Sequence, residues 1–91
     1  MDFTYDPVKD AANRAKHGVP LLFGARVFDG SHIVLSSERP IDGEFRYKAT
    51  GVVDGKLWTA IHAWRDGTIR LISVRRSNGG EQRDFGAIDV G

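Results

Sequence analysis

EFRYKATGVVDGKLWTAIHAWRDGTIRLISVRR, residues 44–76, contains two Asp-Gly pairs between runs that are rich in Val, Ile, Thr, Trp and Tyr. Asp-Gly accepts positive φ at both central positions of a two-residue turn, and β-branched and aromatic residues favour strands. Each pair, Asp54-Gly55 and Asp66-Gly67, therefore predicts a hairpin turn. The three runs are predicted to form an antiparallel meander.

Two-residue turns also fix the register, because the residues that flank each turn must face each other. Val53 is then opposite Lys56, and Arg65 is opposite Thr68. Counting outward predicts an aromatic face, expected to be the core side, with three rows: Phe45, Trp64 and Ile69; Tyr47, His62 and Leu71; Gly51, Trp58 and Arg75. The opposite face is predicted to be apolar at its centre and cationic at its ends, with four rows: Arg46, Ala63 and Arg70; Lys48, Ile61 and Ile72; Thr50, Thr59 and Val74; Val52, Leu57 and Arg76.

The row of Arg46, Ala63 and Arg70 stands out on this second face. Neighbouring strands lie about 4.8 Å apart, so the backbones of the two arginines are expected roughly 10 Å apart. Only the small Ala63 lies between them. Two guanidinium groups can therefore converge there on one phosphate group.

The composition sets the limits for the function. The chain has 91 residues, 41% of them hydrophobic and 27% charged, as in one ordinary globular domain. It has no cysteine, no signal-like start and no long apolar run, so we expect a cytoplasmic protein without disulfides or a membrane anchor. Residues 44–76 hold seven Lys/Arg against three Asp/Glu, whereas residues 1–43 hold five against six. This charge gradient favours a localised anion site.

The segments around the meander predict a mixed α+β domain. An N-terminal strand at DFTY is followed by a helix over residues 7–17, with Asp6 as N-cap and Gly18 after its end. A second helix is predicted over residues 20–28, a strand over 32–36, an exposed loop over 37–43 and a short helix over EQRDFGAI with Phe85 and Ile88 facing inward. The first helix is expected to press a stripe of small residues against the sheet: Val8, Ala11, Ala12 and Ala15.

The sequence lacks the residue patterns that most enzyme classes require. The three histidines, His17, His32 and His62, belong to different predicted elements, and no paired metal-ligand motif or nucleophile elbow is present. We therefore expect no metal and no cofactor. His17 is interpreted first as a helix C-cap, and His62 first as a core or half-buried histidine rather than a general base.

The cationic residues leave two interpretations. A charged residue at every second position is often only the solvated side of a sheet. Alternatively, the arginines act on RNA, in which the 2′-OH can attack the adjacent phosphate. A protein then needs only to orient the backbone and to stabilise the doubly charged transition state, for which fixed guanidiniums suffice without a metal. General acid-base help is open to His17, His62 or Glu81.

Several short motifs occur in a familiar order: F-x-Y-D-P-x-K at residues 3–9, N-x-x-K-H-G-V at 13–19, A-R-V-F-D at 25–29, E-x-R at 44–46, and IRLISVRR at 69–76 followed by E-x-R-x-F at 81–85. Together they resemble the BrnT family, the ribonuclease toxins of type II toxin-antitoxin pairs, over nearly the whole chain. The resemblance implies a single BrnT-like domain over residues 1–91 with a RelE-like fold, in which helices precede an antiparallel sheet. It also implies RNA cleavage, and silencing by a BrnA antitoxin that itself binds operator DNA.

The family's arginines fall on Arg46, Arg70, Arg75 and Arg76 by this resemblance. The chain departs from the family pattern at Phe85, where an aromatic residue with a hydroxyl is expected, and at the loose segment 77–80. Our sequence-based hypothesis is a metal-independent endoribonuclease that cleaves mRNA, and the alternative is a non-catalytic module that binds nucleic acid or protein on the basic face. The expected catalytic residues are Arg46, Arg70, Arg76 and His62, and the expected RNA-binding residues are Lys48, Arg75, His17 and Glu81. The antitoxin is expected to cover the cationic face around Ile61, Ile72 and Val74.

Overall fold

The computed structural model describes residues 1–36 and 44–89, and the loop predicted over residues 37–43 lies outside them. The meander consists of β3 (Tyr47–Val53), β4 (Lys56–Arg65) and β5 (Thr68–Arg76). Both turns have positive φ at their two central residues, 51° at Asp54 and at Asp66 and 78° and 80° at the glycines that follow. The hairpin turns predicted from the two Asp-Gly pairs are thus confirmed.

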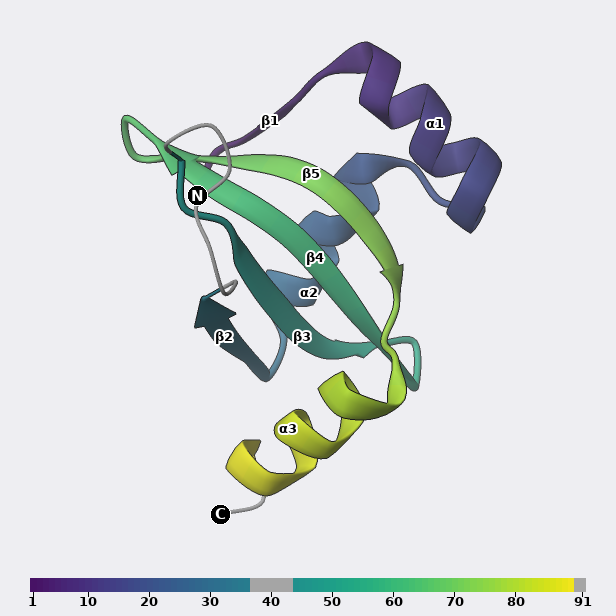
Figure 1. The fold of residues 1–91 in the computed structure, drawn as a ribbon, viewed down its shortest axis with the longest axis vertical. Helices are drawn as coiled ribbons and strands as arrows, with labels where there is room; N and C mark the ends of the chain where they lie inside the picture. Colours follow the sequence, from purple (N-terminus) through teal and green to yellow (C-terminus); the bar gives the residue numbers. More distant parts are fainter. Residues whose placement is uncertain (37–43, 90–91) are drawn as a thin grey trace.

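Two further strands complete a five-stranded sheet in the order β1-β5-β4-β3-β2 (Figure 1). β1 (Phe3–Tyr5) runs parallel to β5, and β2 (His32–Ser36) runs antiparallel to β3. The mixed α+β class and the strand predicted over residues 32–36 are confirmed. The parallel pairing of β1 with β5 was not predicted, because a three-residue strand carries no signal for its partner.

The predicted register holds along all of β3 and β4 but only along the first half of β5. Arg70 pairs with Ala63 and Leu71 with His62 as predicted, and Ile61 then pairs with Ser73 because a bulge adds one residue to β5. An added residue reverses which face each later side chain occupies. The predicted rows beyond the bulge are therefore wrong: Val74 pairs with Ala60, Arg75 with Thr59 and Arg76 with Trp58.

The first helix, α1 (Pro7–His17), has the predicted bounds, N-cap and C-terminal glycine. The predicted packing is wrong, since Val8 is 78% exposed and the alanines of the small-residue stripe are exposed too. The helix docks instead through Asn13, which is 5% exposed. The Asn13 side chain accepts a hydrogen bond from the Val74 amide and donates one to the Val74 carbonyl, both at 2.9 Å. An amide side chain thus pairs with β5 as a neighbouring strand would.

The core lies on the face of the sheet covered by a 3-10 turn, η1 (Leu21–Gly24), and by α2 (Ala25–Asp29). These two elements replace the single helix predicted over residues 20–28. A Cβ on Gly24 would lie 2.8 Å from a Val74 methyl, so η1 approaches the sheet closely. The predicted aromatic core face is confirmed at its centre, but Phe45 and Trp64 are 59% and 49% exposed. They lie beyond the area that the helices cover. The buried cluster comprises Leu21, Val27, Ala49, Val53, Ala60, Ile69, Leu71 and Val74.

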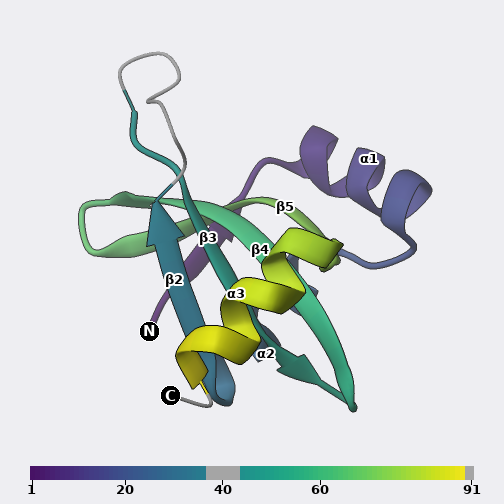
Figure 2. The ribbon, with the colours of Figure 1, turned by 60° about the horizontal axis from the view of Figure 1, so that its bottom comes forward.

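The last helix, α3 (Gly79–Asp89), lies on the opposite face of the sheet, so that Figure 2 shows α3 in front of the strands and α2 behind them. It begins earlier and is longer than predicted. The Glu81 amide donates to the Asn78 side chain, and the Asn78 amide donates to the Glu81 carboxylate, both at 2.9 Å. This reciprocal capping box makes residue 79 the first helical residue. Phe85 is half-buried, but Ile88 is 53% exposed, against the prediction.

We call the side that carries α3 the cationic face, defined by Lys48, Thr59, Arg70 and Arg75. The register and the alternation of side chains along each strand place all four on this side. None of the described helices has the length and apolar character needed to cross a membrane.

Candidate functional site

Arg46 and Arg70 gather at one end of the cationic face. Arg70 lies opposite Ala63 on β4, and Arg46 directly precedes β3. The Glu44 carboxylate accepts two hydrogen bonds from Arg65, at 2.7 and 3.2 Å. Its pKa is lowered by this pairing with Arg65 and, more weakly, by the charges of Arg46 and Arg70. Both guanidiniums therefore lie near the same carboxylate.

Neither of these two arginines is neutralised within the described residues. Arg65 takes both oxygens of Glu44, and no ion pair involves Arg46 or Arg70 in residues 1–36 and 44–89. The Arg46 Nε is also buried without a hydrogen-bond partner there. A buried donor without an acceptor is costly, on the order of 1–3 kcal/mol.

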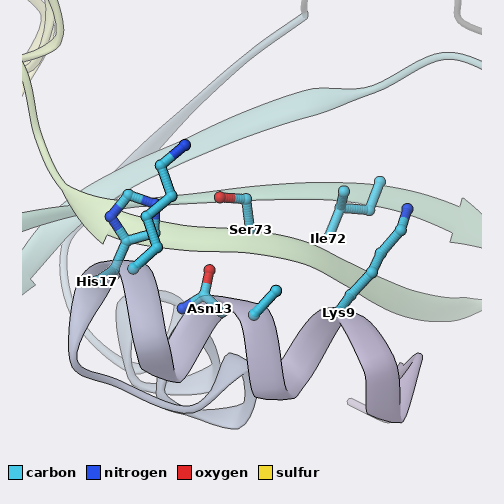
Figure 3. A pocket seen from close by; sticks show the side chains of 7 residues that line it. Lys9, Asn13, His17, Ile72 and Ser73 are labelled. Atoms are coloured by element: carbon cyan, nitrogen blue, oxygen red, sulfur yellow. The ribbon is translucent and has the colours of Figure 1, made fainter.

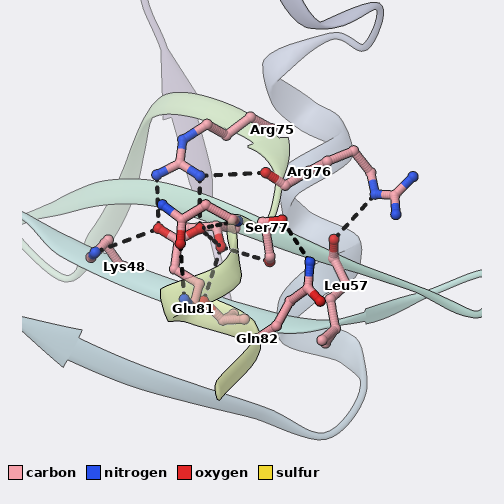
Figure 4. A network of polar contacts seen from close by, with 10 residues as sticks. Lys48, Leu57, Arg75, Arg76, Ser77, Glu81 and Gln82 are labelled. Atoms are coloured by element: carbon pink, nitrogen blue, oxygen red, sulfur yellow. Dashed lines mark hydrogen bonds and ion pairs between the residues drawn. The ribbon is translucent and has the colours of Figure 1, made fainter. Parts of the chain in front are cut away.

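A second cationic group surrounds Glu81, at the other end of the same face (Figure 4). Arg75 donates to both Glu81 oxygens at 2.7 Å, and the Lys48 Nζ lies 3.4 Å from one of them. The buried Thr59 hydroxyl and the Asn78 amide donate to the carboxylate as well, at 3.0 and 2.9 Å. Glu81 itself is only 3% exposed.

Burial disfavours the charged form of Glu81, but the hydrogen bonds from Arg75, the Asn78 amide and Thr59 outweigh it and lower its pKa to about 2. Glu81 is therefore ionised and acts as an internal counter-ion. The structure brings together three of the four predicted RNA-binding residues, Lys48, Arg75 and Glu81, with the carboxylate accepting hydrogen bonds from both cations. The spacing Asn78-x-x-Glu81 is a capping-box pattern, which indicates that Glu81 binds the start of the last helix. The sequence-based prediction did not use this pattern.

His17 lies at the C-terminal end of α1 beside β5, where it lines a pocket with Ile72 and Ser73 (Figure 3). It is half-buried. Its pKa is lowered by burial and by the nearby charges of Lys16 and Arg75. Burial and these two charges therefore favour the neutral form of the His17 ring.

Two predicted catalytic residues lie away from this face. His62 is fully buried on the core side, between Phe28 and Tyr47, and burial lowers its pKa. Arg76, moved by the bulge, lies over the Trp58 ring at 5.6 Å and donates to the Leu57 carbonyl. Arg70 points to the opposite side of the sheet from both residues.

The described residues contain no group of three or more His, Cys, Asp or Glu side chains placed to hold a metal ion. Glu44 and Glu81, which lie among the arginines, are each held by a guanidinium. The groups free to meet a ligand on the cationic face are thus mainly cations, and their chemistry suits a phosphate.

Comparison with curated protein sequences gives no match. A family model described as "Ribonuclease toxin, BrnT, of type II toxin-antitoxin system" matches residues 5–81. This match covers most of the chain, from the end of β1 to the Glu81 counter-ion, and includes both arginines near Glu44. The chain therefore belongs to the BrnT family of ribonuclease toxins of type II toxin-antitoxin systems.

Proposed function

We propose that this protein is a metal-independent endoribonuclease that cleaves mRNA in the cytoplasm, with a RelE-like arrangement of helices and sheet. The observation that carries the proposal is the pair Arg46 and Arg70, which lie near one carboxylate while neither has an ion-pair partner within the described residues. The family is one of ribonucleases, which favours an enzyme over a module that only binds.

In the proposed reaction, the 2′-oxygen of the RNA attacks the adjacent phosphorus, and the bond from phosphorus to the 5′-oxygen of the next nucleotide breaks. The 2′-OH loses its proton, and the leaving oxygen gains one. Negative charge builds on the non-bridging phosphate oxygens in the transition state. Arg46 and Arg70 would donate to these oxygens, because a planar guanidinium matches a phosphate with two parallel N–H bonds.

The remaining cations have supporting roles in this proposal. Arg75 and Lys48 bind the RNA backbone next to the arginine pair, on the same face. Arg76 and His62 have no place in the proposed site, since they lie on the other side of the sheet and His62 is buried. Glu81 positions Arg75 rather than touching RNA.

A BrnA-like antitoxin is proposed to silence the enzyme by covering Arg46 and Arg70, and operator DNA would be bound only through that antitoxin. Ile61 and Ile72 on this side are half-buried and offer apolar surface between the two cationic groups. Val74, expected at the centre of this surface, is instead fully buried in the core. A structure of the complex with Arg46 and Arg70 fully exposed would contradict this arrangement.

Cleavage by purified protein in EDTA is expected to persist and to show no titration near neutrality, because arginine stays charged there. A histidine base would instead give an inflection below the ordinary imidazole pKa of about 6.5, since the pKa values of His17 and His62 are both lowered. The test is the cleavage rate between about pH 5 and 8 for wild type, His17→Gln and His62→Gln. Loss of cleavage in EDTA, or an inflection that disappears in either variant, would overturn the arginine-only account.

A further inference from the structure

A pocket of about 160 Å³ opens between α1 and β5 (Figure 3). Lys9 and His17 extend from α1 toward the strand, and Ile72 and Ser73 face them from β5. Lys16 and the buried Asn13 complete the polar lining. No acidic side chain lines this pocket.

The two lysines of the pocket are available for a ligand. Lys9 and Lys16 are seven residues apart, about two helical turns or 10 Å, so both lie on one side of α1. Neither makes an ion pair within the part of the chain that the structure describes. The acidic neighbour on the helix, Asp10, is held by Arg14 and by the Leu21 amide. The lysine charges are therefore not neutralised from within the helix.

Hydrogen bonds from Asn13 anchor one wall of the pocket. Asn13 donates to the carbonyls of Val19 and Val74 and accepts from the Val74 amide, all at 2.9 Å. These bonds hold α1 against β5 and so set the distance between the helix backbone at the two lysines and Ser73. A site held in advance in this way binds its ligand at a lower entropic cost.

The pocket lies along the path from one cationic group to the other. Ser73 pairs with Ile61, which places it on the cationic face with Arg70 and Arg75. Arg70 is three residues before Ser73 on the strand, roughly 10 Å away. An RNA strand held at the arginine pair and running along β5 would reach the pocket within a few nucleotides.

We infer that this pocket binds a backbone phosphate of the RNA, next to the phosphate that is cleaved, through Lys9, Lys16 and the Ser73 hydroxyl. The inference rests on the proposed function, because it assigns a subsite to the same substrate. The His17 ring lines the same pocket and offers a further hydrogen-bonding group. The positive lining and the absence of carboxylates exclude a metal ion as the ligand.

The test uses an RNA oligonucleotide that is 2′-O-methylated throughout, which the proposed reaction cannot cleave because no 2′-OH is free. Its affinity is measured at several salt concentrations for wild type, Lys16→Ala and Lys9→Ala/Lys16→Ala. Lys56→Ala is the matched control, since Lys56 is an exposed lysine at the first hairpin turn and away from the pocket. Cleavage of unmodified RNA by the wild type is measured in parallel.

Loss of one phosphate contact is expected to reduce the slope of log K against log salt by about 0.7 for single-stranded RNA. We expect this change and about tenfold weaker binding in Lys16→Ala, a further loss in the double variant, and wild-type values in Lys56→Ala. If the wild type binds and cleaves RNA but Lys16→Ala and the double variant match it, the pocket is not a subsite and the proposed function stands. Equal losses in Lys16→Ala and Lys56→Ala would likewise overturn the inference. If the wild type neither binds nor cleaves RNA, both proposals fall.

Discussion

Replacing Arg70 with lysine is expected to remove most of the ribonuclease activity although the charge is kept. Arg70 and Arg46 are proposed to act on one phosphate, and a guanidinium supplies a planar pair of donors that an ammonium cannot reproduce. Removing one preorganised donor to a developing negative charge typically lowers the rate by about 10²- to 10³-fold. The measurement is the single-turnover cleavage rate of Arg70→Lys against wild type.

The paired action of the two arginines is tested by the double variant. Arg46→Ala combined with Arg70→Ala should cost less than the sum of the two single losses in free energy, because groups that act as a unit are not additive. Melting temperatures should stay within a few degrees, since Arg70 is partly exposed and makes no ion pair among the described residues. Lys56→Ala is the control. Wild-type cleavage by Arg70→Lys, or equal damage from Lys56→Ala, would contradict the paired site.

Glu81→Gln is expected to lower the free energy of unfolding at pH 7 by about 3 kcal/mol, the lower end of the cost of removing one partner from a buried ion pair. Glu81 is 3% exposed and binds Arg75 through both oxygens, so the neutral amide leaves that guanidinium without its counter-ion. For a domain of this size the melting temperature should fall by roughly 10 °C or more. Asp84→Asn, an exposed change in the same helix, should have little effect.

The effect of Glu81 also has a defined pH dependence. Its pKa in the folded protein, about 2, lies below the ordinary value of 4.5, so its stabilisation is present above about pH 4.5 and is lost as the pH falls toward 2. The difference in unfolding free energy between wild type and Glu81→Gln should therefore shrink over this range. Comparing the two proteins removes the contributions of Asp10 and Glu44, whose pKa values are also lowered. A difference that stays constant from pH 7 to about 2.5 would show that Glu81 is not the ionised partner.

The sequence predicts the meander well because its determinants are local. Asp54-Gly55 and Asp66-Gly67 set two turns, and the turns set the pairing up to Leu71. The bulge after Leu71 has no local signal, since Ile72 and Ser73 are ordinary strand residues. It arises where β5 must pair with β4 on one side and with Asn13 on the other. One added residue then exchanges the faces of Arg75 and Arg76.

The candidate site, like the meander, is predictable from the sequence only where local turns determine it. The pairing of Arg70 with Ala63 lies before the bulge, and the register places it correctly. Glu81 was expected to bind RNA, but in the structure its carboxylate binds Arg75. The reason is that α3 begins at a capping box, which places the Glu81 carboxylate over β4 and β5. The position of α1 depends on hydrogen bonds between Asn13 and Val74 and from the Leu21 amide to Asp10, rather than on the apolar stripe of the helix. Helical periodicity carries no information on such a contact.

In the proposed reaction the 2′-OH of the RNA is the nucleophile, and arginines, without a metal, stabilise the transition state. The most direct test compares one RNA oligonucleotide, in EDTA, with the same oligonucleotide carrying a single 2′-deoxy nucleotide at the cleaved position. The account predicts cleavage of the first to a 2′,3′-cyclic phosphate and a 5′-hydroxyl end, and no cleavage of the second at that position. Equal cleavage of both oligonucleotides, or cleavage that requires an added metal ion, would contradict it.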